Sequence, residues 1–218
     1  MAVITLTQAL VSTLGVNGVR WRQHRYDMSS HQSDANGNSQ DRLGGPPRWG
    51  LTIAAPEGLE TDDAVLWEEL MLQLRGRVNY LLAWDPKRPA PRGTMRGTMV
   101  LDGAHSAGAT TLNVTVIGTG QVGNTILRGS PLQISSGLGT LQLVRTIGDA
   151  TAANVGGNSD IALTIEPPLL RAYSNATAVT WDKAATYFKA TGNGVAEWSY
   201  HTRGIQQGFA IDLLERWA

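Results

Sequence analysis

The strongest constraint on this fold is a long internal stretch without aromatic residues. Residues 85–172 contain no Trp, Tyr or Phe, whereas the seven Trp, five Tyr and two Phe of the chain all lie at 21–84 or 173–217. Charges are also sparse between residues 99 and 170, where they are Arg128, Arg145, Asp102, Asp149, Asp160 and Glu166. A chain of 218 residues has room for two small domains. We therefore expect a module at 97–170 inserted into a domain built from residues 1–96 and 171–218.

The inserted stretch has the pattern of a small all-β module. Short runs rich in Thr, Val, Ile and Leu alternate with glycine turns, at 98–101, 110–116, 132–135, 141–147 and 161–165. Short strands at even spacing are typical of small β-barrels and sandwiches. A proline-rich segment at 85–93 precedes the module, and Pro167-Pro168 ends it. Because proline disrupts regular structure, both segments suit domain boundaries.

The flanking sequence predicts further strands and one helix. The helix is expected over 61–75, because Thr61 can cap its start, apolar residues recur at helical spacing, and Gly76 can end it. Strands are expected at 19–26, 48–54, 77–84, 187–190, 196–201 and 209–214, and the polar segment 29–47 is expected to be a long loop. The predicted fold class is mainly β: a β-sandwich or split barrel with one flanking α-helix, interrupted by a small inserted β-barrel-like module.

A glycine pattern that could indicate a nucleotide site is better explained as a turn. Gly118, Gly120 and Gly123 match the G-x-G-x-x-G spacing of dinucleotide-binding loops. That function needs a helix directly afterwards, because its N-terminal amides hold the pyrophosphate. Gly129 and Pro131 leave no room for such a helix. We interpret the glycines as a tight turn.

Other residues that commonly carry catalysis are missing or scattered. The chain has no Cys, which excludes disulfides, thiol catalysis and Cys-ligated metals. Its four His show none of the usual metal-binding spacings, and the acid pairs at 62–63 and 68–69 suit a helix start and a solvated helix face. We therefore expect no catalytic residues, no cofactor and no metal, and a protein that is not an enzyme.

Arginine is the main candidate for molecular recognition. Arg20, Arg22 and His24 alternate along one side of the predicted strand 19–26, and more arginines follow in the proline-rich linker. Arginine is enriched at protein interfaces, although an ordinary polar sheet face would give the same pattern. The candidate interface residues are Arg20, Arg22, His24, Arg42, Arg48, Arg88, Arg92 and Arg96.

Charge and hydropathy exclude several classes of partner. The 18 basic and 18 acidic side chains cancel, which argues against a dedicated binder of nucleic acid or anionic membranes. No apolar run is long enough to span a bilayer, and residues 1–15 lack the basic start of a secretion signal. We therefore expect neither specific nucleic-acid binding nor membrane association.

Two segments resemble proteins of phage tails. Residues 61–97 resemble a recurring pattern in tail proteins of tailed phages, an amphipathic helix, then a hydrophobic strand, then a basic Pro/Gly segment. Residues 103–179 resemble a module of tail-tip and baseplate proteins, with a strand pair across 127–134, a V-x-x-I-x-D-A strand at 144–150 and an I-x-P-P-L segment at 165–169. The family that these features indicate is the distal tail protein of siphophages.

The resemblance implies a structural role in the virion. A distal tail protein is a β-sandwich flanked by a helix, which assembles as a hexameric ring and joins the tail tube to the baseplate hub and fibres. The implied partners are other copies of the chain, the tail tube protein, and hub and fibre proteins; the protein would be made in the cytoplasm of the bacterial host. Many such proteins carry an extra domain after the first domain, whereas here it is inserted.

Two alternatives stay open within the same class of virion proteins. Tail tube and tail terminator proteins share the design of a sandwich with one helix. A carbohydrate-binding module for host recognition is the other alternative. It is disfavoured because such modules stack sugars on exposed aromatic rings, and residues 99–170 contain none.

Overall fold

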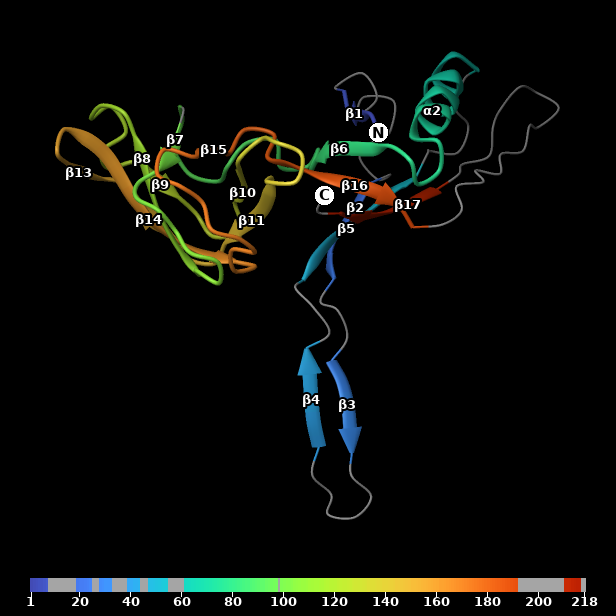
Figure 1. Cartoon of the computed structure of the whole chain (residues 1–218). Coiled ribbons are helices and arrows are strands. Elements are labelled where there is room, and N and C mark those ends of the chain that lie inside the picture. The colour runs from blue at the N-terminus through green and yellow to red at the C-terminus, as the bar shows by residue number, and fades with distance from the viewer. Residues whose placement is uncertain are drawn as a thin grey trace.

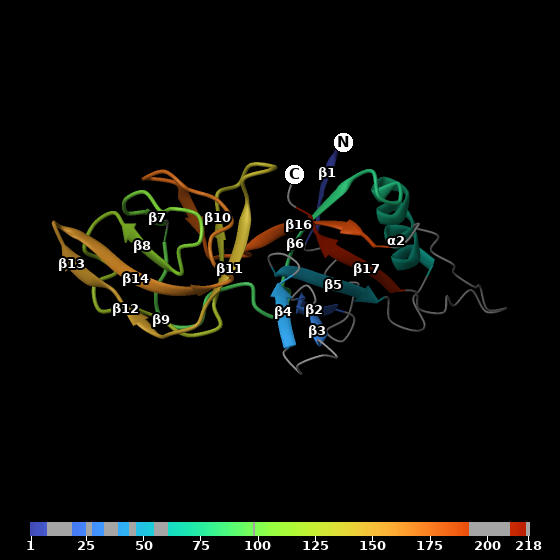
Figure 2. The same cartoon turned by 60° about the horizontal axis from the view of Figure 1, so that its bottom comes forward.

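The computed structural model describes residues 1–7, 19–24, 28–32, 39–43, 47–54, 61–97, 99–191 and 210–216. Two large sheets lie side by side in both views, and one helix accompanies the sheet that contains the N-terminal strand (Figures 1 and 2). The predicted fold class, mainly β with one helix, is confirmed. We call the sheet beside the helix the flanking sheet and the other unit the barrel.

The flanking sheet has six strands in the order β1-β6-β16-β17-β5-β2. The pair β1–β6 is parallel and the other four pairs are antiparallel. Among the described residues, the edge strands β1 and β2 each have one neighbour. The strands are β1 (Val3–Thr5), β2 (Val19–His24), β5 (Arg48–Ala54), β6 (Tyr80–Trp84), β16 (Ala185–Ala190) and β17 (Ala210–Glu215).

Helix α2 (Thr61–Leu74) forms the second layer over one face of this sheet. Its apolar stripe of Trp67, Leu70 and Leu74 is buried against side chains of β5, β6, β16 and β17. The helix ends where Arg75 and Gly76 adopt φ values of 47° and 63°, a left-handed turn that glycine favours. The expectation for this domain was a β-sandwich or split barrel with one flanking helix, and the described residues give one six-stranded sheet with that helix over one face.

The inserted unit is a closed β-barrel. Its strands follow the order β11-β10-β15-β7-β8-β14-β13, and an additional pairing of β11 with β14 closes the first six into a barrel. The strands are β7 (Met99–Leu101), β8 (Thr111–Val116), β10 (Pro131–Ile134), β11 (Gln142–Thr146), β13 (Ala153–Val155), β14 (Asn158–Glu166) and β15 (Ala178–Thr180). A short pair of β9 (Thr125–Ile126) and β12 (Ala150–Thr151) lies beside it. The expected barrel-like module is therefore present.

The barrel extends further along the chain than its composition indicates. Strand β15, at residues 178–180, pairs with both β10 and β7, so the barrel does not end at residue 170 as expected. Tyr173 and Trp181 are buried in the barrel core rather than in the flanking domain. The expected boundary is too early because β15 is needed to connect β10 with β7, and this pairing leaves no local mark in the sequence.

The predicted loop at 29–47 is wrong in part, because it contains a β-hairpin. Strands β3 (Met28–Gln32) and β4 (Ser39–Leu43) pair from Met28–Leu43 to Gln32–Ser39. Apart from Met28 and Leu43, their residues are polar, so the strands lack the alternation that marks a half-buried strand. In Figure 1 the hairpin projects away from the flanking sheet, beyond the ends of β2 and β5. The strand predicted at 196–201 lies outside the described residues.

The barrel and the flanking sheet are packed against each other. The Trp49 indole Nε1 donates a hydrogen bond to the Leu143 carbonyl at 2.9 Å, and the Arg145 guanidinium lies 4.9 Å from the centre of the Trp49 ring. Arg145 also pairs with Asp85 at 3.7 Å. Burial lowers the pKa of Arg145, the nearby charge of Arg88 lowers it further, and Asp85 opposes both. These contacts hold the barrel on strand β5 of the flanking sheet.

Candidate interaction site

Among the described residues, a group of cations gathers on the face of the flanking sheet that lies opposite helix α2. In an antiparallel sheet, alternate residues of a strand point to opposite faces. Trp21 and Trp49 pack against the core beneath α2, so Arg20, Arg22 and Arg48 belong to the other face. Arg20 and Arg22 are exposed on the edge strand β2, and Arg48 is half-buried on β5.

Strand register brings further cations onto the same face. Arg22 pairs with Gly50, Gly50 with Leu214, and Leu214 with Lys189. The Lys189 ammonium lies 4.3 Å from the centre of the Tyr80 ring, which continues the row onto β6. One row of paired residues therefore connects Arg22 at the sheet edge with Lys189 near the centre.

Three cations meet at a pocket on this face. The pocket has a volume of about 290 Å³ and is lined by Arg77, Tyr80, Lys189, Ala190 and Arg216. Arg77 comes from the turn after α2, and its Nε donates to the Ala190 carbonyl at 3.3 Å. Arg77 also donates to the Thr191 carbonyl, so the end of β16 holds its guanidinium at the pocket wall. We name the set Arg20, Arg22, Arg48, Arg77, Lys189 and Arg216 the basic face.

Among the described residues, one carboxylate is placed on the basic face. Asp212 of β17 lies 3.7 Å from the Arg22 guanidinium and accepts a hydrogen bond from the Thr52 hydroxyl at 2.6 Å. The Lys189 ammonium instead contacts the Tyr80 ring and the Met1 sulfur, at 3.7 Å from the latter. The described charges of this face are therefore unbalanced in favour of cations.

The structure divides the predicted interface residues into two groups. Arg20, Arg22 and Arg48 lie together on the basic face. His24 of β2 and Arg42 of β4 are placed on their strands, but their side chains lie outside the described part of the structure.

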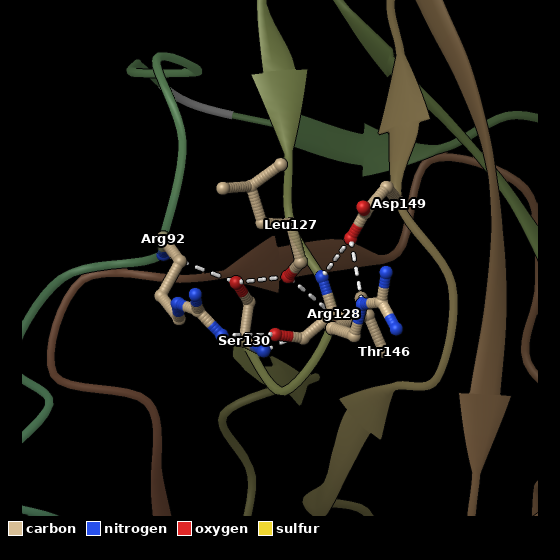
Figure 3. Close-up of polar contacts among 6 residues, drawn as sticks. All are labelled: Arg92, Leu127, Arg128, Ser130, Thr146 and Asp149. Carbon is tan, nitrogen blue, oxygen red and sulfur yellow. Dashed lines mark hydrogen bonds and ion pairs between the residues drawn. The ribbon is translucent and has the colours of Figure 1, made fainter.

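The linker arginines form the second group, which is bound to the barrel. The Arg92 backbone N–H donates to the Ser130 hydroxyl at 3.0 Å, and its guanidinium donates to the Arg128 carbonyl at 3.1 Å (Figure 3). Arg96 donates to the Gly93 carbonyl at 3.2 Å. Arg88 lies near Arg145, whose pKa its charge lowers. The bonds of Arg92 fasten the linker to the barrel, and none of these three arginines belongs to the basic face.

The same corner of the barrel is stabilised by a network of hydrogen bonds (Figure 3). The hydroxyls of Ser130 and Thr146 both donate to the Leu127 carbonyl, at 2.7 and 3.0 Å. The Asp149 carboxylate accepts the Arg128 N–H at 2.7 Å, a bond that lowers the pKa of Asp149. These bonds join Arg92 of the linker, the segment from Leu127 to Ser130 and Asp149, as expected for a structural corner.

Sequence reasoning missed Arg77, Lys189 and Arg216 as members of the site. They lie in three separate segments, and they meet because β6, β16 and β17 are neighbours in the sheet. The one local signal was the position of Lys189 between two apolar residues of a strand. Cross-strand register could not be read from a single sequence.

Within the described ranges, no group of three or more His, Asp or Glu side chains could hold a metal ion, and the one helix is too short to cross a membrane. The glycine turn at 118–123 has φ values of 87° at Gly118 and 83° at Gly123, and no helix follows it before β9. No protein-family model and no curated protein matches the chain.

Proposed function

We propose that this chain is a structural protein of a phage tail tip, a distal tail subunit that forms a ring and joins the tail tube to the baseplate hub and fibres. It acts as a scaffold and not as an enzyme, and its place is the tail of the virion. Its partners in this role are further copies of itself, the tail tube protein, and the hub and fibre proteins. The sequence resemblance to tail proteins motivates the proposal, and the form of the flanking sheet supports it.

The observation that carries the proposal is the open flanking sheet. Strands β1 and β2 each have one neighbour among the described residues, so each presents a row of backbone N–H and C=O groups on its other side. Proteins that act alone usually block such edges, whereas ring subunits use them for pairing. The Arg20 and Arg22 side chains stand on edge strand β2, where they can guide a neighbouring copy.

The β3–β4 hairpin and the barrel suit the same role. The hairpin projects beyond the flanking sheet (Figure 1), and all of its strand residues except Met28 and Leu43 are polar. A projecting hairpin of this kind can reach a neighbouring subunit. The barrel is closed, and Trp49, Leu143 and Arg145 fasten it to the sheet, so it forms a rigid spacer or docking platform for the fibres.

The test is the position and number of this chain in the particle. Purified virions that contain it are labelled with gold-conjugated antibody, and its copies are counted by peptide mass spectrometry against the major tail tube protein. The proposal expects label at the tail end remote from the capsid and a copy number of one ring. Copies that exceed one ring along the whole tail would identify a tube protein, and label beside the capsid would identify a terminator. Absence from the particle would contradict a virion role.

A further inference from the structure

The outer side of helix α2 is unusual for a surface that faces only water. Asp62, Val65, Glu69 and Leu72 follow one another at spacings of three or four residues, so they form one stripe along the helix. All four are exposed, and the two aliphatic side chains expose 52% for Val65 and 73% for Leu72. The stripe therefore combines two carboxylates with two uncovered aliphatic groups. We name it the acidic stripe.

Helix α2 itself contains acidic residues and no basic residue. Its sequence, TDDAVLWEELMLQL, contains four acidic residues and no Lys or Arg. In the acidic stripe, the Glu69 carboxylate accepts a hydrogen bond from Gln73 at 2.8 Å. The helix lies over one face of the flanking sheet, and the basic face lies on the other. The balanced charge of the chain, 18 against 18, thus conceals a separation of charge across the flanking sheet.

We propose that the basic face of one copy binds the acidic stripe of a second copy. This inference rests on the proposed function only in that both require the chain to assemble with itself. The Glu69 and Asp62 carboxylates of one copy would meet the ammonium and guanidinium groups around the pocket of the next. Because the two surfaces are different, the contact is head-to-tail and leaves one surface of each kind for a further copy. Repetition of such a contact gives a ring if the rotation between successive copies closes, and a filament if it does not.

The apolar groups of the two surfaces also match. Met1 is 86% exposed, and its sulfur contacts the Lys189 ammonium at the pocket. Val3 is 40% exposed, and it pairs in register with Tyr80 of the pocket wall. Burial of Val65 and Leu72 against these residues would remove apolar surface from water on both sides. Charge pairing would set the orientation of the contact, and the aliphatic groups would contribute to its strength.

A nucleic acid is the other polyanion that a row of cations on a sheet can bind. The observations favour a second copy because this chain itself supplies a matching acidic surface. The zero net charge of the chain also provides no long-range attraction for a phosphate backbone. Binding of nucleic acid is therefore an outcome to be tested and not part of the proposal.

The test reverses charge on one surface at a time in the full-length chain. The face variant carries Lys189→Glu and Arg216→Glu, and the stripe variant carries Asp62→Lys and Glu69→Lys. Matched controls place the same reversals elsewhere, with Lys87→Glu in the linker and Asp102→Lys on the barrel, both at exposed positions. Assembly is measured by light scattering after size-exclusion chromatography, and duplex DNA binding by fluorescence anisotropy. Circular dichroism checks the fold, and Glu69→Lys alone replaces the stripe variant if the double substitution unfolds.

The proposal expects each variant to lose self-assembly, with assembly weakened by about tenfold or more, while the controls assemble like the unmodified chain. An equimolar mixture of the two variants should assemble again, because each then meets an oppositely charged surface. The proposal is overturned if both variants assemble normally, or if they fail and the mixture does not recover. Loss of DNA binding in the face variant, with assembly unchanged, would assign the basic face to nucleic acid. An unmodified chain that stays monomeric would overturn this contact and the ring function together.

Discussion

The barrel and the flanking sheet differ in the pairing of their outermost strands. The barrel pairs β11 with β14 and so closes six strands within one chain, whereas the flanking sheet ends in β1 and β2, each with one described neighbour. Their charges differ as well, because the barrel sequence is charge-poor and the flanking sheet carries the basic face. The two regions therefore differ both in how their edge strands are paired and in the charge that they carry. The barrel completes its strand pairing within one chain, and we propose that the flanking sheet completes its own with another molecule.

The largest effect is expected from the barrel core. Trp181 is 2% exposed and packs among the buried residues of the barrel. Replacement by alanine leaves a cavity, so Trp181→Ala should lower the free energy of unfolding by about 3–5 kcal/mol. All other tryptophans lie outside 85–180, so their fluorescence reports mainly on the rest of the chain. The free energy of unfolding measured by this fluorescence should therefore fall less than the one measured by circular dichroism. Ile117→Ala, at a barrel position that is 87% exposed, is the control. Equal loss by both probes would mean that the barrel is not a separate unit.

A second effect is expected where the linker enters the barrel. Gly93 has a φ of 102°, and a Cβ at this position would overlap the Thr125 carbonyl oxygen, which accepts the N–H groups of Thr94 and Met95. Gly93→Ala should therefore cost about 2–3 kcal/mol in urea denaturation. Gly103 also has a positive φ, of 82°, but its Cβ would have nothing within 4 Å. Gly103→Ala should cost about 1 kcal/mol, and a cost equal to that of Gly93→Ala would refute the close-contact explanation.

A smaller effect is expected at the contact between the two regions. Trp49→Phe keeps an aromatic ring beneath Arg145 but removes the hydrogen bond to the Leu143 carbonyl. The loss should be about 1 kcal/mol, the usual net value of one such bond. Hydrogen exchange should show faster opening of β5 and β11 together, because the bond joins them. Unchanged exchange in both strands would contradict a stabilising role of this hydrogen bond.

The smallest effect at neutral pH, and the clearest at high pH, concerns Tyr173. Burial raises the pKa of this phenol to about 12, Arg171 opposes the shift, and Glu215 of the flanking sheet adds to it. Below pH 10 the phenol is neutral in both states. Between about pH 10 and 12 the unfolded chain ionises first, so stability should fall as the pH rises. Urea denaturation at pH 9 and pH 11 should show a smaller fall for Tyr173→Phe than for the unmodified chain. An identical fall in the free energy of unfolding of both proteins would contradict a raised pKa of Tyr173.

Local patterns predicted the individual elements well. Strand β5 matches its expected range of 48–54, and the helix expected at 61–75 is found at Thr61–Leu74. Helix caps and the alternation of polar and apolar residues depend on residues that are close together in the chain, so they can be recognised in a single sequence. The hairpin of β3 and β4 was missed because its stability comes from pairing between two polar segments, which leaves no alternation to detect.

Features that depend on distant residues could not be predicted in the same way. Strand β15 joins the barrel only because β7 and β10 lie on either side of it. Likewise, the alternation of Arg20 and Arg22 indicated one strand of the basic face. Lys189 and Arg216 became part of it only through the order of strands in the flanking sheet. Half of the candidate site was therefore visible in the sequence, and its full extent required the fold.

We propose that other copies of the chain pair with the flanking sheet and complete it. Native mass spectrometry of the purified full-length protein, combined with electron microscopy of the same sample, tests it most directly. We expect one discrete mass equal to several chains, and particles that are closed rings. A single-chain mass at all accessible concentrations, with no rings in the images, would contradict it.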